Sequence, residues 1–111
     1  MNTLRPPPLD NAELRARFEG RPDLLRRMIK IFDEQTPRLL ARLQEAVGRK
    51  DAPGIRSAAH TLKGSLLQFG AHTAAGTAGQ LEQSGDSSSP LLDQLNAQVA
   101  EVQQYLNTLD V

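Results

Sequence analysis

The stretch that decides the fold is AAHTLKGSLLQFGA, residues 58–71. Apolar residues recur in and just before it at intervals of four, three, four and three, at Ile55, Ala59, Leu62, Leu66 and Phe69. This spacing draws a single apolar stripe down a helix. The sequence therefore predicts a helix that is capped by Asp51, buries the stripe and ends at Gly70.

The side of this helix away from the stripe carries the residues that could do chemistry. At about 100° per residue, His60 lies roughly 140° from the stripe and Gly64 roughly 180°, so both face outward. Lys63 and Gly64 follow His60 by three and four residues, which makes them its surface neighbours. Glycine inside a helix costs about 1 kcal/mol relative to alanine. We interpret Gly64 as giving a partner's surface access to the imidazole of His60.

The pattern His-x-Leu-Lys-Gly-Ser on an outward face, closed by Gly70-Ala71, resembles the phosphoacceptor motif of histidine-containing phosphotransfer (HPt) domains. The resemblance extends over about residues 10 to 109. It implies that Nε2 of His60 takes a phosphoryl group from a phospho-aspartate and passes it to another aspartate. The implied partners are response-regulator receiver domains and a hybrid sensor histidine kinase, which leaves this chain as a carrier without autonomous kinase activity.

Phosphoryl transfer needs positive charge near the equatorial oxygens more than it needs a base. Lys63 is the candidate for that charge. Arg56, one turn before His60, is expected to add to the field or contact the receiver, and the exposed Leu67 is expected to give the receiver an apolar contact. No acidic cluster near His60 and no nucleotide-binding motif is present, so Mg²⁺ is expected to come with the partner and no cofactor is predicted.

Composition restricts the possible functions. The chain has 111 residues, enough for a single domain, and no cysteine, so disulfides and thiolate metal sites are excluded. Thirteen basic and thirteen acidic residues give zero net charge, which argues against nucleic acid or a membrane surface as the partner. Because no signal peptide or spanning segment is evident, we expect a cytoplasmic protein.

The rest of the chain predicts four more helices and no strand. Residues 1–9 contain three successive prolines and are expected to be a tail or linker, with an SH3-type ligand as the alternative. A short helix capped by Asp10 or Asn11 should stop at Gly20. A long helix from Pro22 to about Arg49 should bend near residues 33–36, because Pro37 removes a backbone hydrogen bond.

Two helices complete the prediction. The first, from about His72 to Gln83, has small residues facing inward and is expected to be the weakest. The last follows the loop at residues 85–90 and carries a regular stripe from Leu92 to Leu109. We therefore expect residues 10–111 to form an all-α, antiparallel four-helix bundle, likewise implied by the resemblance, with the short first helix across one end. Its predicted core contains Leu25, Ile29, Phe32, Leu62, Leu66, Phe69, Leu81, Leu95, Val99, Val102 and Leu106.

Three questions remain open from the sequence. A helical adaptor that binds partner helices, with His60 incidental, would keep its function after loss of the imidazole. A metal site using His60 and His72 lacks a recognisable ligand spacing. The resemblance places Glu82 at a position that flanks the active histidine in some HPt domains, but the sequence alone does not place it within reach of His60, so its role stays open. Gln68 lies on another side of its helix, where we expect a structural role. A monomer is expected.

Overall fold

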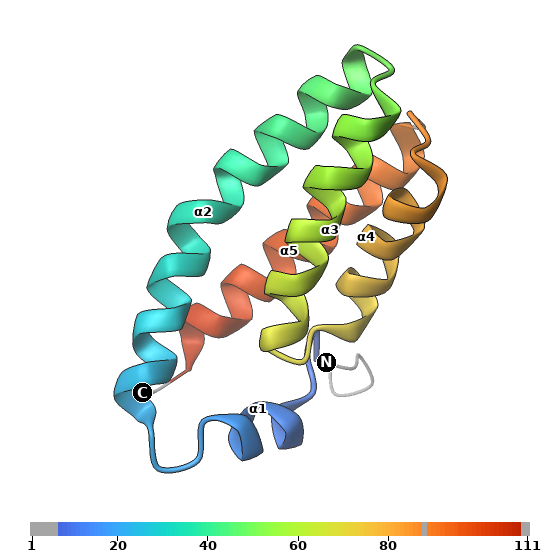
Figure 1. Ribbon diagram of the computed structural model, residues 1–111. Coiled ribbons are helices and arrows are strands. Elements are labelled where there is room, and N and C mark those ends of the chain that lie inside the picture. Colours follow the sequence, from blue (N-terminus) through green and yellow to red (C-terminus); the bar gives the residue numbers. More distant parts are fainter. Residues whose placement is uncertain (1–6, 88, 110–111) are drawn as a thin grey trace.

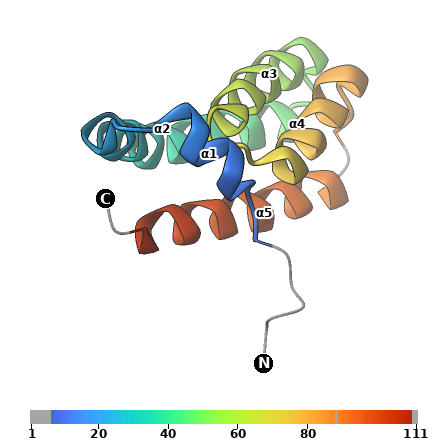
Figure 2. The ribbon, with the colours of Figure 1, turned by 90° about the horizontal axis from the view of Figure 1, so that it is seen from below.

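The computed structural model describes residues 7–87 and 89–109, and this part of the chain is all helical apart from turns and loops. In chain order the elements are α1 (Asn11–Arg17), α2 (Pro22–Gly48), α3 (Ala52–Gln68), α4 (His72–Ser84) and α5 (Ser89–Thr108). The helices α2 to α5 form the bundle, and α1 lies across one end of it (Figure 1). The view from below shows α1 crossing that end (Figure 2). The predicted class and architecture are confirmed.

Local sequence signals set the helix ends. The side chains of Asp10 and Asp51 accept hydrogen bonds from the backbone N–H of the third residue of α1 and of α3, at 3.0 and 3.1 Å, as N-caps do. At the other ends, Gly70 follows α3 with φ +71° and Gly85 follows α4 with φ +59°. These left-handed conformations favour glycine and let the chain reverse between helices.

The longest helix, α2, passes through Pro37 without ending. Proline has no N–H to donate to the carbonyl four residues back, yet the apolar stripe keeps its register on both sides of it. The buried stripe holds α2 together because it packs on the bundle over the full length, at Leu25, Ile29, Phe32, Thr36, Leu39, Leu43 and Ala46. The prediction of one long helix rather than two is confirmed.

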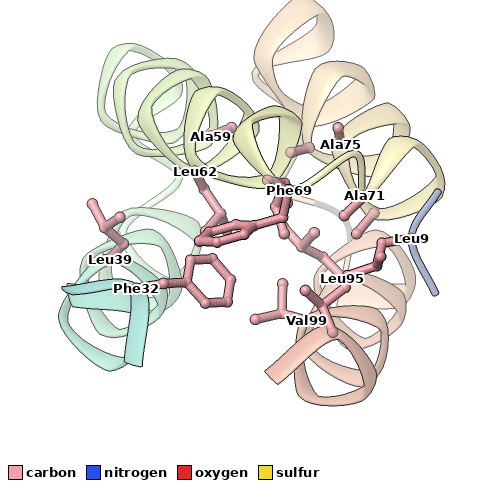
Figure 3. Close-up of a cluster of buried hydrophobic side chains, with 14 of the residues drawn as sticks. Leu9, Phe32, Leu39, Ala59, Leu62, Phe69, Ala71, Ala75, Leu95 and Val99 are labelled. Atoms are coloured by element: carbon pink, nitrogen blue, oxygen red, sulfur yellow. The ribbon is translucent and has the colours of Figure 1, made fainter. Parts of the chain in front are cut away.

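Every residue of the predicted core is buried. Phe69, at the end of α3, is buried, with its ring centroid 5.2 Å from that of Phe32 on α2 and 6.4 Å from that of Phe18 at the end of α1. Figure 3 shows Phe32 and Phe69 between the helices, with Leu95 and Val99 of α5 on the opposite side. Burial of these apolar side chains is the main force that holds the bundle together.

Small residues on α4 let it approach α3 closely. Ala74, Ala75 and Ala78 are buried, and α3 with α4 makes the most extensive helix pair in the bundle. Alanine leaves room for two helix backbones to lie close together. This close pairing determines which α4 side chains reach the outer face of α3.

The first helix is fastened to the turn between α3 and α4. The N–H of Asp10 donates to the carbonyl of Gly70 at 2.9 Å, and Nη1 of Arg17 donates to the carbonyl of Leu67 at 2.9 Å. Leu14 and Phe18 are buried, and so is Leu9, the last residue of the predicted tail. Within the described residues, no helix is both long enough and apolar enough to cross a membrane.

Candidate functional site

His60 stands on the outer face of α3. Its side chain is 68% exposed, whereas Ala59 and Leu62 on the inner face of the helix are fully buried. The outward position predicted from the apolar stripe is therefore correct. The ring is accessible to a macromolecular partner without any rearrangement of the bundle.

Glu82, near the end of α4, holds the imidazole from one side. Its Oε2 lies 2.5 Å from Nδ1 of His60. A carboxylate only accepts hydrogen bonds, so this contact places the proton of a neutral ring on Nδ1. Nε2 makes no hydrogen bond to any residue in the described part of the chain. The nitrogen that remains available is the one farther from the helix backbone.

Lys63 shares the same carboxylate. Its Nζ lies 2.6 Å from Oε1 of Glu82, so the two oxygens of Glu82 serve two different groups of α3. Hydrogen bonds from Lys63 and then from His60 lower the pKa of Glu82 from its usual 4.5, against a smaller opposing effect of desolvation. The side chains of Lys63 and Glu82 are 33% and 24% exposed, so the ion pair is partly shielded from solvent.

Gly64 and Leu67 continue the outer face of α3 toward α1. A Cβ placed on Gly64 would meet nothing within 4 Å, so the backbone beside His60 is bare and open. Leu67 is 37% exposed, and the guanidinium group of Arg17 binds its carbonyl. Ile31 on α2 is the other exposed large apolar side chain of the described residues.

Arg56 does not join the cluster of His60, Lys63 and Glu82. It is exposed, but its guanidinium group lies against the turn after α4, with Nε 3.0 Å from the position a Cβ would take on Gly85. A cation there suits the carbonyl end of α4, where the helix dipole is negative. The side chain of Gln68 is exposed and makes no hydrogen bond in the described part of the chain.

His72 lies apart from His60. Its Nε2 is 2.8 Å from Oε1 of Glu13 on α1, while His60 bonds Glu82 ten residues farther along α4, about 15 Å at 1.5 Å per residue. Among the described residues, no group of three or more His, Cys, Asp or Glu side chains is arranged to hold a metal ion. The two histidines therefore do not form the shared metal site that was considered as an alternative.

Sequence reasoning left Glu82 unassigned, although a signal for it exists. Helices α3 and α4 form a hairpin around Ala71, and His60 precedes Ala71 by eleven residues as Glu82 follows it by eleven. Residues equally distant from the turn of an antiparallel hairpin lie at the same level. The contact between Arg17 and the carbonyl of Leu67 has no comparable signal, because α1 and α3 are far apart in sequence.

One of three comparisons with known proteins gives a match. The protein-family model of the Hpt domain matches residues 27–105, more than half of the chain. The matched range includes His60, Lys63, Gly64 and Glu82 and leaves out α1. The comparison with curated proteins gives no match, and neither does the comparison with solved structures.

Proposed function

The chain belongs to the Hpt domain family, and on that premise we propose that His60 is the residue that carries the phosphoryl group. The family acts in histidine phosphotransfer within phosphorelay signalling, and the chain is a phosphotransfer carrier rather than an autonomous kinase. The observation that supports His60 most directly is the contact of its Nδ1 with Glu82, which leaves Nε2 free on a side chain 68% exposed.

The tautomer gives His60 its reactivity. With the proton on Nδ1, the lone pair of Nε2 points away from the carboxylate and can attack phosphorus. In-line attack requires the receiver's aspartyl phosphate to approach along the outer face of α3. Gly64 supports this approach, because nothing lies within 4 Å of the place where a side chain would stand.

Lys63 supplies positive charge to the transferring group in this proposal. A loose transition state spreads negative charge over three equatorial oxygens, and an ammonium group one turn from the nucleophile stabilises it. Leu67 offers the receiver an apolar contact on the same face. Arg56 contributes at the edge of the docking surface, since it is exposed but lies against the end of α4.

Hpt domains interact with receiver domains, and the cognate receivers of this chain are proposed to be those of a hybrid sensor histidine kinase and a response regulator. The receiver brings the Mg²⁺ that the transfer requires. The chain itself takes no cofactor, works in the cytoplasm and is a monomer in solution. Among the described residues, only two large apolar side chains are exposed, Ile31 on α2 and Leu67 on α3, and this supports the monomer.

The test is transfer from a panel of receivers charged with acetyl phosphate. We expect at least one receiver to label the chain, with the label stable in base, labile in acid and located on His60 by peptide mapping. A chain that binds receivers tightly but accepts phosphate from none of them would instead support the helical adaptor. Sedimentation of the unlabelled chain as a stable dimer would contradict the monomer.

A further inference from the structure

The carboxylate of Glu82 has two partners in the unloaded protein, in which His60 carries no phosphoryl group. Oε2 faces Nδ1 of His60 at 2.5 Å and Oε1 faces Nζ of Lys63 at 2.6 Å. The cation proposed to assist phosphoryl transfer is therefore already engaged as a counter-ion. Lys63 must therefore weaken or break its ion pair with Glu82 before its ammonium group can bind an incoming phosphoryl group.

Loading of His60 changes the charges around Glu82. The lone pair of Nε2 forms a bond to phosphorus, and the bond from phosphorus to the aspartyl oxygen breaks, its electron pair leaving with the receiver's carboxylate. The ring keeps its Nδ1 proton and gains one positive charge, while the phosphoryl group brings about two negative charges. Glu82 then faces a cationic ring, and Lys63 has a dianion beside it.

We propose that Lys63 exchanges counter-ions when His60 is loaded, leaving Glu82 for the phosphoryl oxygens while Glu82 stays on the Nδ1 proton. The exchange rests on the proposed function, because it requires His60 to be the phosphoacceptor. The new positive charge of the ring then faces the carboxylate of Glu82, and the phosphoryl group faces the positive charge of Lys63. Glu82 is thereby a positioning residue that orients the ring and holds Lys63 in reserve.

The surroundings of Lys63 permit this movement. The side chain is 33% exposed, and its stem runs past Gly79 of α4, where an added Cβ would stand 3.6 Å from Cδ. The bare backbone of Gly79 leaves the stem without a bulky neighbour on that side. The ammonium group of lysine lies at the end of four flexible carbons, so rotation about the terminal bonds moves it without moving α3.

A carboxylate is required for the exchange, and an amide would not substitute for it. Glutamine at position 82 can still accept the Nδ1–H bond, so it preserves the tautomer of His60. It carries no charge to hold Lys63 or to balance the cationic ring. Glu82→Gln therefore separates orientation of the ring from control of the lysine.

The direct test is NMR of the lysine ammonium groups in protein labelled with ¹⁵N-lysine. The chain has only three lysines, Lys30, Lys50 and Lys63, so the signals are readily assigned. In the unloaded protein, Glu82→Gln should shift the Lys63 signal. After a phosphorylated receiver has loaded His60, the Lys63 ammonium signal should show contact with phosphorus. Its position should then no longer change with Glu82→Gln. Glu13→Gln, which alters the carboxylate beside the other histidine, should change neither state.

The outcomes separate this proposal from the proposed function. If His60 becomes phosphorylated while the Lys63 signal still depends on Glu82 and shows no contact with phosphorus, the exchange is wrong and the phosphoacceptor stands. If no phosphate reaches His60, the proposed function itself fails.

Kinetics provide a second, independent readout. Lys63→Met should slow transfer both in the parent and in the Glu82→Gln background. The slowing should be at least about threefold greater in the Glu82→Gln background, because only in the parent must Lys63 first leave a counter-ion. Equal factors in both backgrounds would overturn the exchange. Glu13→Gln again provides the matched background, in which the factor should equal that of the parent.

Discussion

The two histidines of this chain have closely similar surroundings, but only His60 is proposed to accept a phosphoryl group. Each is exposed, each bonds a glutamate of another helix, and each has a glycine four residues later: His60 with Glu82 and Gly64, His72 with Glu13 and Gly76. Each glutamate also has a cation nearby, Lys63 for Glu82 and Arg17 for Glu13. Exposure, a carboxylate and a neighbouring glycine therefore do not define the site by themselves.

The difference lies in which nitrogen the carboxylate takes and where the cation comes from. Glu82 engages Nδ1 of His60 and leaves Nε2 free, whereas Glu13 engages Nε2 of His72 and leaves only Nδ1, the ring nitrogen nearer to its own backbone. Lys63 sits one turn from His60, while the residue at the same spacing after His72 is the buried Ala75. Ring orientation and local charge, rather than accessibility, are therefore what set His60, the proposed nucleophile, apart from His72.

Removal of the imidazole ring of His60 should have the largest effect of any single change. His60→Gln should abolish phosphate acceptance from a charged receiver, and His72→Gln should retain it, because only His60 offers a free Nε2 beside a lysine. Both are surface changes, and each should change the free energy of unfolding by no more than about 0.5 kcal/mol. Acid-labile, base-stable label on the His60→Gln protein would have to lie on His72 and would refute the assignment.

Removal of the cation should have the next largest effect. Lys63→Ala is expected to slow acceptance by roughly 10- to 100-fold without abolishing it, since Nε2 remains and only charge stabilisation of the transition state is lost. Stopped-flow or quench-flow measurement of transfer gives the rate. Lys30→Ala, an exposed helical lysine on α2, is the control and should transfer at the parent rate.

The paired glycines test access separately from stability. A Cβ at either Gly64 or Gly76 would meet nothing within 4 Å, so Gly64→Gln and Gly76→Gln should each stabilise their helix by a few tenths to about 1 kcal/mol. Only Gly64→Gln should slow transfer, by a few-fold, because it fills the approach to His60. Chemical denaturation gives the stability of both variants, and transfer assays give their rates. Equal transfer rates would contradict the proposal that Gly64 gives the receiver access to His60.

The smallest expected effect concerns pH. The pKa of Glu82 is lowered in the folded protein by its bonds to Lys63 and His60, so its contribution to stability is present above its ordinary pKa of 4.5. That contribution is lost as the pH falls through the lower folded value. The stability difference between the parent and Glu82→Gln, measured by thermal unfolding, should therefore shrink as the pH is lowered below about 4.5. A difference that grows on acidification would contradict the ion pair.

Sequence predicted the fold more completely than the site. Periodic apolar stripes and capping residues identified all five helices and the core, because burial imposes those patterns on any amphipathic helix. The outward positions of His60, Lys63 and Gly64 followed from the same helical geometry. The bridging carboxylate of Glu82 did not, because hydrogen bonds between helices depend on side-chain rotamers and on how closely two backbones approach.

The fastening of α1 has a practical consequence for where this domain can be cut. The family match ends before Leu106 and begins after Leu14, Phe18 and Leu25, all of which are buried. A gene fragment trimmed to residues 27–105 would leave Phe69 without the ring of Phe18 and expose an apolar surface at that end. Such a fragment would be prone to aggregate during expression even though it contains His60, Lys63, Gly64 and Glu82. Stable boundaries therefore lie outside the recognisable motif, at Leu9 and beyond Leu106.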